Sequence, residues 1–208
     1  MKLNWAERLA VNNPARPIQQ KLEIRWMKKH RTLAPGSAIL EVGCGRGAGA
    51  ALIRREFRPS SLQAMDLDLR MIRGARKYLS PDRRTGVSFF AGDALRLPCK
   101  DETFDAVFGF GVLHHVPDWQ GALGELARVL KPGGVYFLEE LYPSLYQNFL
   151  TKHILLHPRE NRFRSGDLKR ALKDAGLDLG HLLEFSRVGI LGISTKKSIS
   201  QMGRMARS

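Results

Sequence analysis

Residues 38–49 read AILEVGCGRGAG, an apolar run that gives way to alternating glycines. This pattern predicts a short strand, a tight turn and a helix that begins near residue 48. Glycine accepts positive φ angles and lets a ligand approach the main chain closely. The N–H groups at the start of the following helix attract an anionic group. The stretch therefore predicts a nucleotide-type binding loop, and an ordinary strand-to-helix turn is the alternative.

The composition is that of a single soluble domain, with 208 residues of which 43% are hydrophobic. The chain contains no apolar run long enough to span a membrane, and its first residues lack the apolar centre of a signal peptide. Its two cysteines, Cys44 and Cys99, make neither a disulfide framework nor a metal cluster. We therefore expect a cytoplasmic protein that binds no metal.

The net charge is +14, from 34 Lys and Arg against 20 Asp and Glu. Such a surplus attracts polyanions, so an anionic membrane surface and nucleic acid are both candidate partners. A basic surface without a specific partner is the alternative. Because of this charge, the expected location is the cytoplasm, with peripheral binding to a membrane surface as a further option.

Apolar runs bounded by turn residues predict the strands of one sheet. Strands and helical patterns alternate four times, which predicts a parallel sheet with right-handed crossovers. Two later runs are separated by a short turn and are expected to pair antiparallel. The predicted strands are 38–42, 62–66, 87–91, 104–110, 135–139, 181–185 and 188–193, and the predicted helices include 18–31, 48–57, 69–79 and 119–130.

The first of these helices has Ile18, Leu22 and Trp26 at helical spacing, which predicts its apolar face. Further along, Asp68 and Asp118 stand where they would cap the helices that follow them. The parts of the chain are a helical cap over 1–36, a main domain over 37–194 with a substrate lid at about 141–164, and a basic tail over 195–208 whose pattern allows disorder.

The spacing Gly43-x-Gly45-x-x-Ala48 fits the dinucleotide fingerprint, and Asp66 ends the next strand about 20 residues on. These two features fit a nicotinamide cofactor and S-adenosylmethionine equally well. Three further features favour the second. Glu41 stands where a carboxylate would hold the amino group of an amino-acid-bearing ligand, Gly-Asp-Ala at 92–94 follows the third strand, and a helix and hairpin end the domain.

With these motifs the sequence resembles the class I S-adenosylmethionine-dependent methyltransferases, in particular the small single-domain kind that includes quinone-biosynthesis C-methyltransferases. The resemblance covers about residues 37–194. It implies a Rossmann-like α/β fold with a doubly wound, mostly parallel seven-stranded sheet, an antiparallel final strand and helices on both faces. It rests on LEVGCGRG at 40–47, MDLD at 65–68, GDA at 92–94, FDAV at 104–107 with LHHVPD at 113–118, and VLKPGG at 129–134.

The resemblance also implies which residues meet the cofactor, whose product would be S-adenosylhomocysteine. The glycine loop, with Glu41 before it, would hold the methionyl part, Asp66 would hold the ribose and Asp93 the adenine. The implied cofactor residues are Glu41, Gly43, Cys44, Gly45, Gly47, Asp66, Leu67, Asp93, Ala94 and Gly109.

Catalysis asks little of side chains, because the methyl group is already activated on a positive sulfur. A general base is needed only for a nucleophile that carries a proton. His114 and His115 are the candidates, with a scaffold role for the pair as the alternative, and Glu140 is a second candidate.

The aromatic residues Tyr142, Tyr146 and Phe149 of the predicted lid suit a small, apolar or aromatic acceptor, and local packing of the lid onto the sheet is the alternative. Two other functions stay open at this stage. The charge suits an RNA or ribonucleoprotein methyltransferase, although no added RNA-binding domain is evident. The third option is a protein that binds the cofactor without turnover.

Overall fold

The computed structural model describes residues 16–146 and 161–198. Its strands are β1 (Ala38–Val42), β2 (Ser61–Asp66), β3 (Val87–Ala91), β4 (Phe104–Phe110), β5 (Leu130–Leu141), β6 (Leu177–Phe185) and β7 (Gly189–Lys196). Its helices are α2 (Arg16–His30), α3 (Ala48–Phe57), α4 (Leu69–Tyr78), α5 (Trp119–Val129), α6 (Pro143–Tyr146) and α7 (Ser165–Asp174), with 3-10 turns η1 (Pro81–Arg84) and η2 (Leu113–His115).

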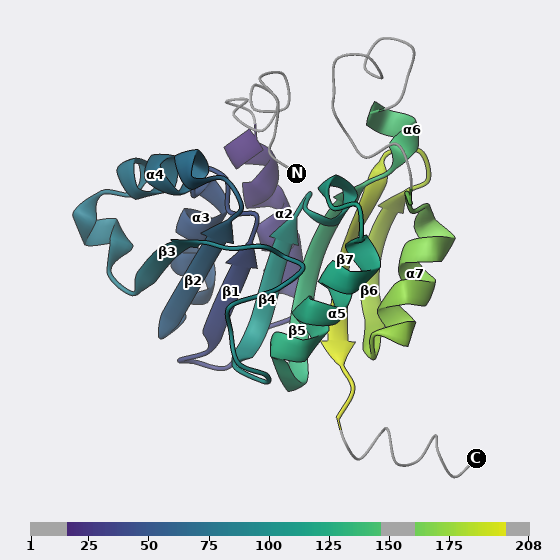
Figure 1. Ribbon diagram of the computed structural model, residues 1–208. Helices are drawn as coiled ribbons and strands as arrows, with labels where there is room; N and C mark the ends of the chain where they lie inside the picture. The colour runs from purple at the N-terminus through teal and green to yellow at the C-terminus, as the bar shows by residue number, and fades with distance from the viewer. Residues whose placement is uncertain (1–15, 147–160, 199–208) are drawn as a thin grey trace.

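The strands form one sheet in the order β3-β2-β1-β4-β5-β7-β6 (Figure 1). The first five in this order are parallel, and β7 runs antiparallel to both β5 and β6. The chain moves outward from β1 to β3 and then returns to place β4 beside β1. Ligands of such sheets bind at this reversal, outside the carboxyl ends of the strands. The predicted fold class is confirmed.

Helices cover both faces of the sheet, with α2, α3 and α4 on one and α5 and α7 on the other (Figure 1). Neighbouring residues of a strand point to opposite faces, so each strand supplies both cores. In β4, Phe108 packs toward α2 and α3, whereas Val107 packs toward α5. Phe108 stacks on Phe137 of β5 with ring centroids 4.4 Å apart. Burying each such side chain stabilises the fold by about 1.5–3 kcal/mol.

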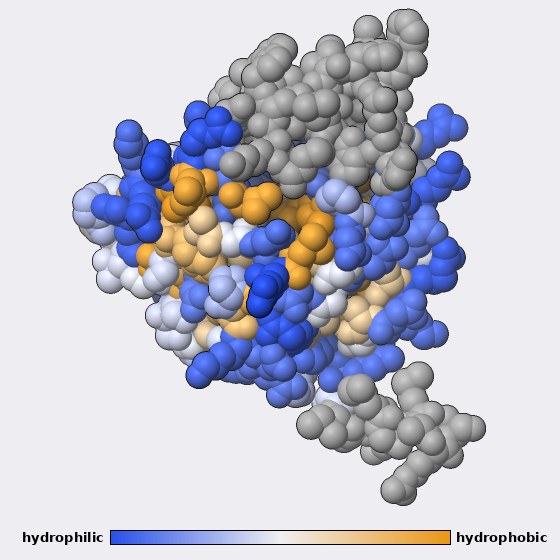
Figure 2. Space-filling view, in the orientation of Figure 1, coloured by the Kyte–Doolittle hydropathy of each residue, from blue (hydrophilic) through white to orange (hydrophobic). Residues whose placement is uncertain are grey.

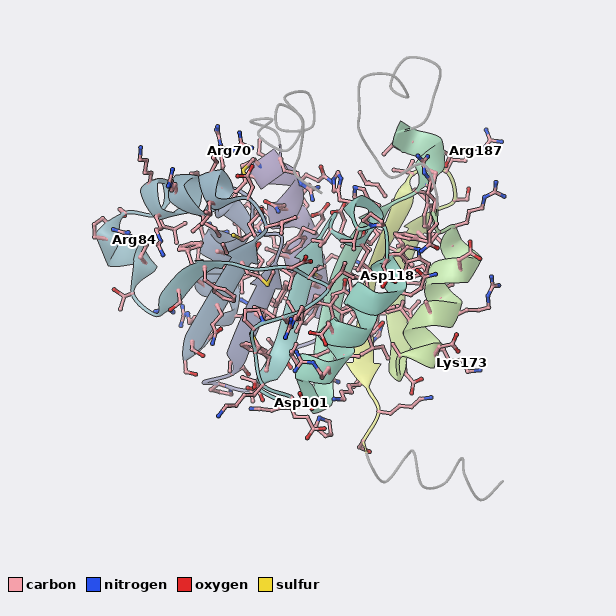
Figure 3. The ribbon with its side chains drawn as sticks, in the orientation of Figure 1. Arg70, Arg84, Asp101, Asp118, Lys173 and Arg187 are labelled. Atoms are coloured by element: carbon pink, nitrogen blue, oxygen red, sulfur yellow. The ribbon has the colours of Figure 1, made fainter. Side chains whose placement is uncertain are left out.

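Two aspartates begin the helices that flank the carboxyl edge of the sheet. Asp68 accepts a hydrogen bond from Arg70 N and so caps α4, and Asp118 accepts one from Gly121 N and caps α5. Figure 3 labels Asp118 at the start of α5 and Arg70 at the start of α4. Both predicted caps are confirmed.

The predicted apolar face of the first helix is wrong for Ile18 and Leu22, whereas Trp26 is partly buried and packs against the core. Ile18 and Leu22 are 66% and 62% exposed, whereas Gln20, Ile24 and Met27 form the buried side of α2. The apolar side chains of α2 that pack on the sheet are Ile24 and Met27, which are fully buried.

The hairpin at the end of the domain is longer than predicted. β7 continues to Lys196, two residues beyond the predicted end of the main domain, and Thr195 pairs with Val135 of β5. Residues 199–208 lie outside the described part of the chain, as do residues 1–15 of the predicted cap and 147–160 of the predicted lid. Within the described residues, no helix combines the length and the apolar character that a membrane crossing requires.

Candidate active site

The glycine loop, residues 43–47, connects β1 to α3 at the point where the sheet order reverses. Gly43 and Gly47 have φ angles of 72° and 85°, which L side chains rarely adopt. A Cβ at Gly43 would come within 2.6 Å of Val112 Cγ2, in the loop after β4. A Cβ at Gly47 would lie 3.0 Å from Ala75 Cβ in α4. The two glycines therefore allow the loop to touch both neighbouring segments.

Asp66 lies at the end of β2 and holds this loop in place. Its Oδ2 accepts a hydrogen bond from Gly45 N at 3.0 Å, and its Oδ1 accepts one from Asp68 N at 2.9 Å. Burial raises the pKa of Asp66 above its ordinary value, although the backbone donors oppose that shift. The carboxylate lies beside the glycine loop, where the resemblance expects it. Asp68 instead pairs with Arg70 at 2.8 Å and belongs to the helix cap.

Glu41 lies under the glycine loop and is 1% exposed. A Cβ at Gly49 would come within 2.0 Å of its Oε1, so the carboxylate requires glycine there. Its Oε2 has no hydrogen-bond partner among the described residues. Burial, and after it the charge of Asp66, raises the pKa of Glu41 to about 8.

An unpaired buried carboxylate oxygen is costly and calls for a donor or a cation. The ammonium group of S-adenosylmethionine supplies both. Glu41 and the loop above it therefore fit this cofactor, which would be held by Glu41, Asp66 and the backbone of residues 43–47.

The remaining predicted cofactor residues lie in different surroundings. Asp93 is exposed in the turn after β3, and its side chain accepts a hydrogen bond from Leu95 N. Leu67 is 41% exposed after β2, beside that turn in the sheet order. Ala94 is buried in the core. Cys44, another predicted cofactor residue, is buried in the glycine loop, and burial raises the pKa of its thiol. Gly109, the last of them, lies inside β4, where a Cβ would come within 3.0 Å of Tyr136 Oη.

The loop after β4 is held by the fully buried carboxylate of Glu140. Its Oε1 accepts hydrogen bonds from Val112 N at 3.1 Å and Leu113 N at 2.8 Å. Its Oε2 lies 3.3 Å from His114 N and 2.8 Å from His114 Nδ1. Since an ionised carboxylate can only accept, the contact with Glu140 assigns a ring proton to Nδ1 of His114. His115 lies against it, with ring centroids 4.3 Å apart.

A second group of charges, absent from the predicted site, lies where α2 meets the end of β5. Arg16 Nη2 is 2.7 Å from Glu139 Oε2, and Arg16 Nη1 is 3.7 Å from Glu23 Oε1. A Cβ placed on Gly111 would lie 3.5 Å from Glu139 Oε2, 3.9 Å from Arg16 Nη2 and 3.2 Å from His114 Cε1. These groups therefore surround one point at the start of the loop that carries His114.

The described ends of the predicted lid are packed into the domain. Tyr142 is 2% exposed, and its hydroxyl donates to Glu184 Oε1 at 2.6 Å. Phe163 packs against Trp119 with ring centroids 4.8 Å apart. Phe149 lies outside the described residues, and so does the side chain of Tyr146. Between 16 and 146 and between 161 and 198, no cluster of three or more His, Cys, Asp or Glu side chains is arranged to hold a metal ion.

Residues 40–138 match the family model described as a methyltransferase domain. Phthiotriol/phenolphthiotriol dimycocerosates methyltransferase of Mycobacterium tuberculosis is 37% identical over 148 residues, 68% of this chain and 54% of that protein. Fatty-acid O-methyltransferase of Mycolicibacterium smegmatis is 39% identical over 108 residues, 52% of this chain and 38% of that protein. The chain thus spans about half the length or less of these curated relatives.

Among solved structures, a SAM-dependent methyltransferase from Aquifex aeolicus superposes with a TM-score of 0.74 at 19% identity. The match covers 94% of this chain and 100% of that chain, and it shows a common fold. Together with the sheet order and the glycine loop, the matches show that the chain belongs to the class I S-adenosylmethionine-dependent methyltransferases.

Proposed function

We propose that this protein transfers a methyl group from S-adenosylmethionine to an oxygen atom of an apolar, lipid-like acceptor. The observation that carries the donor half of the proposal is the unpartnered, buried oxygen of Glu41 beside the glycine loop. The acceptor half draws on the relatives, one named for phthiotriol and one for O-methylation of a fatty acid.

Apolar side chains at the carboxyl edge of the sheet support an apolar acceptor. Leu69 and Leu95 are 57% and 39% exposed there, and Figure 2 shows apolar surface beside α4. At the other end of the same edge, Leu145 and Val188 are 40% and 44% exposed beside the start of the predicted lid. Tyr142 N donates to the carbonyl of Val188 and joins this pair of segments.

His114 is the proposed general base for a hydroxyl acceptor. When bound, S-adenosylmethionine supplies an electrophilic methyl group on a sulfonium. The acceptor oxygen gains the methyl group and loses its proton, which His114 takes at Nε2. Glu140, 2.8 Å from Nδ1, holds the ring in the required tautomer and stabilises its positive charge. An ionised carboxylate acceptor would need no base.

Calorimetry with S-adenosylhomocysteine tests the donor half. We expect the wild-type protein to bind it and Glu41→Gln to bind it at least about tenfold more weakly, since a charge-assisted hydrogen bond is lost. Glu56→Gln is the matched control, because Glu56 pairs with Lys28 between α2 and α3, on the surface. No heat of binding with the wild type would refute the cofactor site.

Transfer of a labelled methyl group to long-chain alcohols and fatty acids tests the acceptor half. Product from either class supports the proposal, whereas product only from RNA or from soluble polar compounds contradicts it. The affinity of the basic chain for anionic membranes stays a prediction, which flotation with anionic vesicles would test.

A further inference from the structure

A second carboxylate oxygen without a partner lies on α2, outside the residues assigned to the donor. The side chain of Glu23 is 11% exposed. Its Oε1 accepts a hydrogen bond from Gln19 Nε2 at 2.7 Å and lies 3.7 Å from Arg16 Nη1. Its Oε2 is buried and has no hydrogen-bond partner among the described residues. Buried acceptors are almost always satisfied, so this oxygen calls for a donor that arrives with a ligand.

Glu23 belongs to the group of charges that borders the proposed base. Arg16 forms ion pairs with both Glu23 and Glu139. Side-chain atoms of Arg16, Glu139 and His114 all lie within 4 Å of the position that a Cβ on Gly111 would take. The donor site lies on the same face of the sheet, where Glu41 holds the other unpartnered oxygen. Glu23 is therefore placed to meet the acceptor molecule rather than the donor.

The surroundings of Glu23 are negative, although the whole chain carries +14. Two carboxylates, those of Glu23 and Glu139, share the guanidinium of Arg16. Burial and the charge of Glu139 raise the pKa of Glu23 to about 7, against the opposing effect of Arg16. A further anion placed there would meet the same desolvation and repulsion. A neutral hydroxyl would instead donate a hydrogen bond to Glu23.

We propose that Glu23 accepts a hydrogen bond from a hydroxyl group of the methyl acceptor, and that the acceptor is a neutral hydroxylated lipid rather than a fatty-acid carboxylate. This inference rests on the proposed function and narrows its acceptor class. The names of the relatives include an acceptor with hydroxyl groups and a fatty acid. The negative charge around Glu23 favours the hydroxylated acceptor over the carboxylate.

The test compares 1,3-dodecanediol with dodecanoate, which have equal chain length and differ in charge. Affinities are measured by calorimetry at pH 8.5 on full-length protein saturated with S-adenosylhomocysteine, so no turnover is required. We expect the diol to bind at least about tenfold more tightly than dodecanoate, from repulsion between charges in a partly buried site. In Glu23→Gln this ratio should fall to about threefold or less, while Glu56→Gln keeps the wild-type ratio.

Dodecanoate binding as tightly as the diol would overturn the inference, and so would a ratio that Glu23→Gln leaves unchanged. Failure of both probes to bind would overturn it as well. Loss of the proposed function looks different, because the protein would then fail to bind S-adenosylhomocysteine in the first step. A protein that binds S-adenosylhomocysteine and prefers dodecanoate would keep the proposed function and refute the role of Glu23.

Discussion

Replacing Glu140 by glutamine tests whether one buried carboxylate holds the loop that carries His114. Glu140 is fully buried, and its oxygens accept from three backbone N–H groups and from His114 Nδ1. Glutamine has the same shape but presents one oxygen and one NH₂ group. The oxygen can keep the bonds to Val112 and Leu113, so the NH₂ group must face His114 N and Nδ1.

The expected loss follows from those two contacts. The His114 N–H loses its acceptor, and an unsatisfied buried donor costs about 1–3 kcal/mol. The Nδ1 contact survives only if the ring proton moves to Nε2, which exchanges a charge-assisted hydrogen bond for a neutral one at a cost of about 1 kcal/mol. Removing a buried charge offsets part of this cost. We expect a loss of about 2–3 kcal/mol, or roughly 4–12 °C in Tm for a chain of this size.

Urea denaturation followed by circular dichroism measures the loss. Glu125→Gln is the control, because Glu125 also accepts a backbone N–H, from Leu97 at 2.8 Å, but lies at the surface beside Arg128. It should cost less than about 1 kcal/mol. Equal losses in the two variants would refute the claim that Glu140 holds the loop.

The same variant tests the proposed base through the position of its proton. With the ring proton on Nε2, His114 can no longer accept a proton from a hydroxyl. Turnover of an alcohol acceptor should fall by about 10²–10⁴. The affinity for S-adenosylhomocysteine should stay within about threefold. An unchanged turnover would assign the His114–Glu140 pair to the scaffold.

Three further predictions concern the donor site. Gly47→Ala should destabilise the protein by about 2–4 kcal/mol in urea denaturation, because the new Cβ would clash with Ala75 and alanine is strained at a positive φ angle. Gly124→Ala is the control: it lies in α5 with open space around it and should stabilise the protein by about 0.5–1 kcal/mol. Asp66→Ala should weaken S-adenosylhomocysteine binding in calorimetry more than Asp68→Ala, and equal effects would reassign the ribose contact. The pKa of Glu41 is raised to about 8 in the folded state, so the folded protein holds one more proton than the unfolded chain between the unfolded pKa and pH 8. The free energy of unfolding should therefore fall as pH rises through that range. Denaturation series from pH 5 to pH 8.5 should show a smaller fall for Glu41→Gln.

The order of strands and the glycine loop could be predicted because each depends on local pattern. A strand that is followed directly by Gly43 turns there, and an acid that ends the next parallel strand lies beside that turn. The inner face of α2 could not be predicted in this way. Its Gln20 and Glu23 look like surface residues in the sequence, and the carboxylates near them, Glu41 and Glu139, come from β1 and β5.

The pairing of His114 with Glu140 also could not be predicted from local sequence pattern. Both residues were candidates for the base when considered one at a time, although 26 residues separate them in the chain. Neighbouring parallel strands, β4 and β5, bring them together at one edge. A polar pair between strand ends has no periodicity of its own, because only the register of the two strands sets it.

The buried carboxylates and the proposed base together account for where charge goes during the reaction. Methyl transfer from a sulfonium to a hydroxyl removes the positive charge from sulfur and releases a proton from the acceptor. If His114 takes that proton, the positive charge stays inside the site, 2.8 Å from Glu140. A base outside the site would leave the buried carboxylate of Glu140 without that positive charge beside it. Because uncompensated buried charge is costly, Glu140 favours proton acceptance at His114 over release of the proton to solvent.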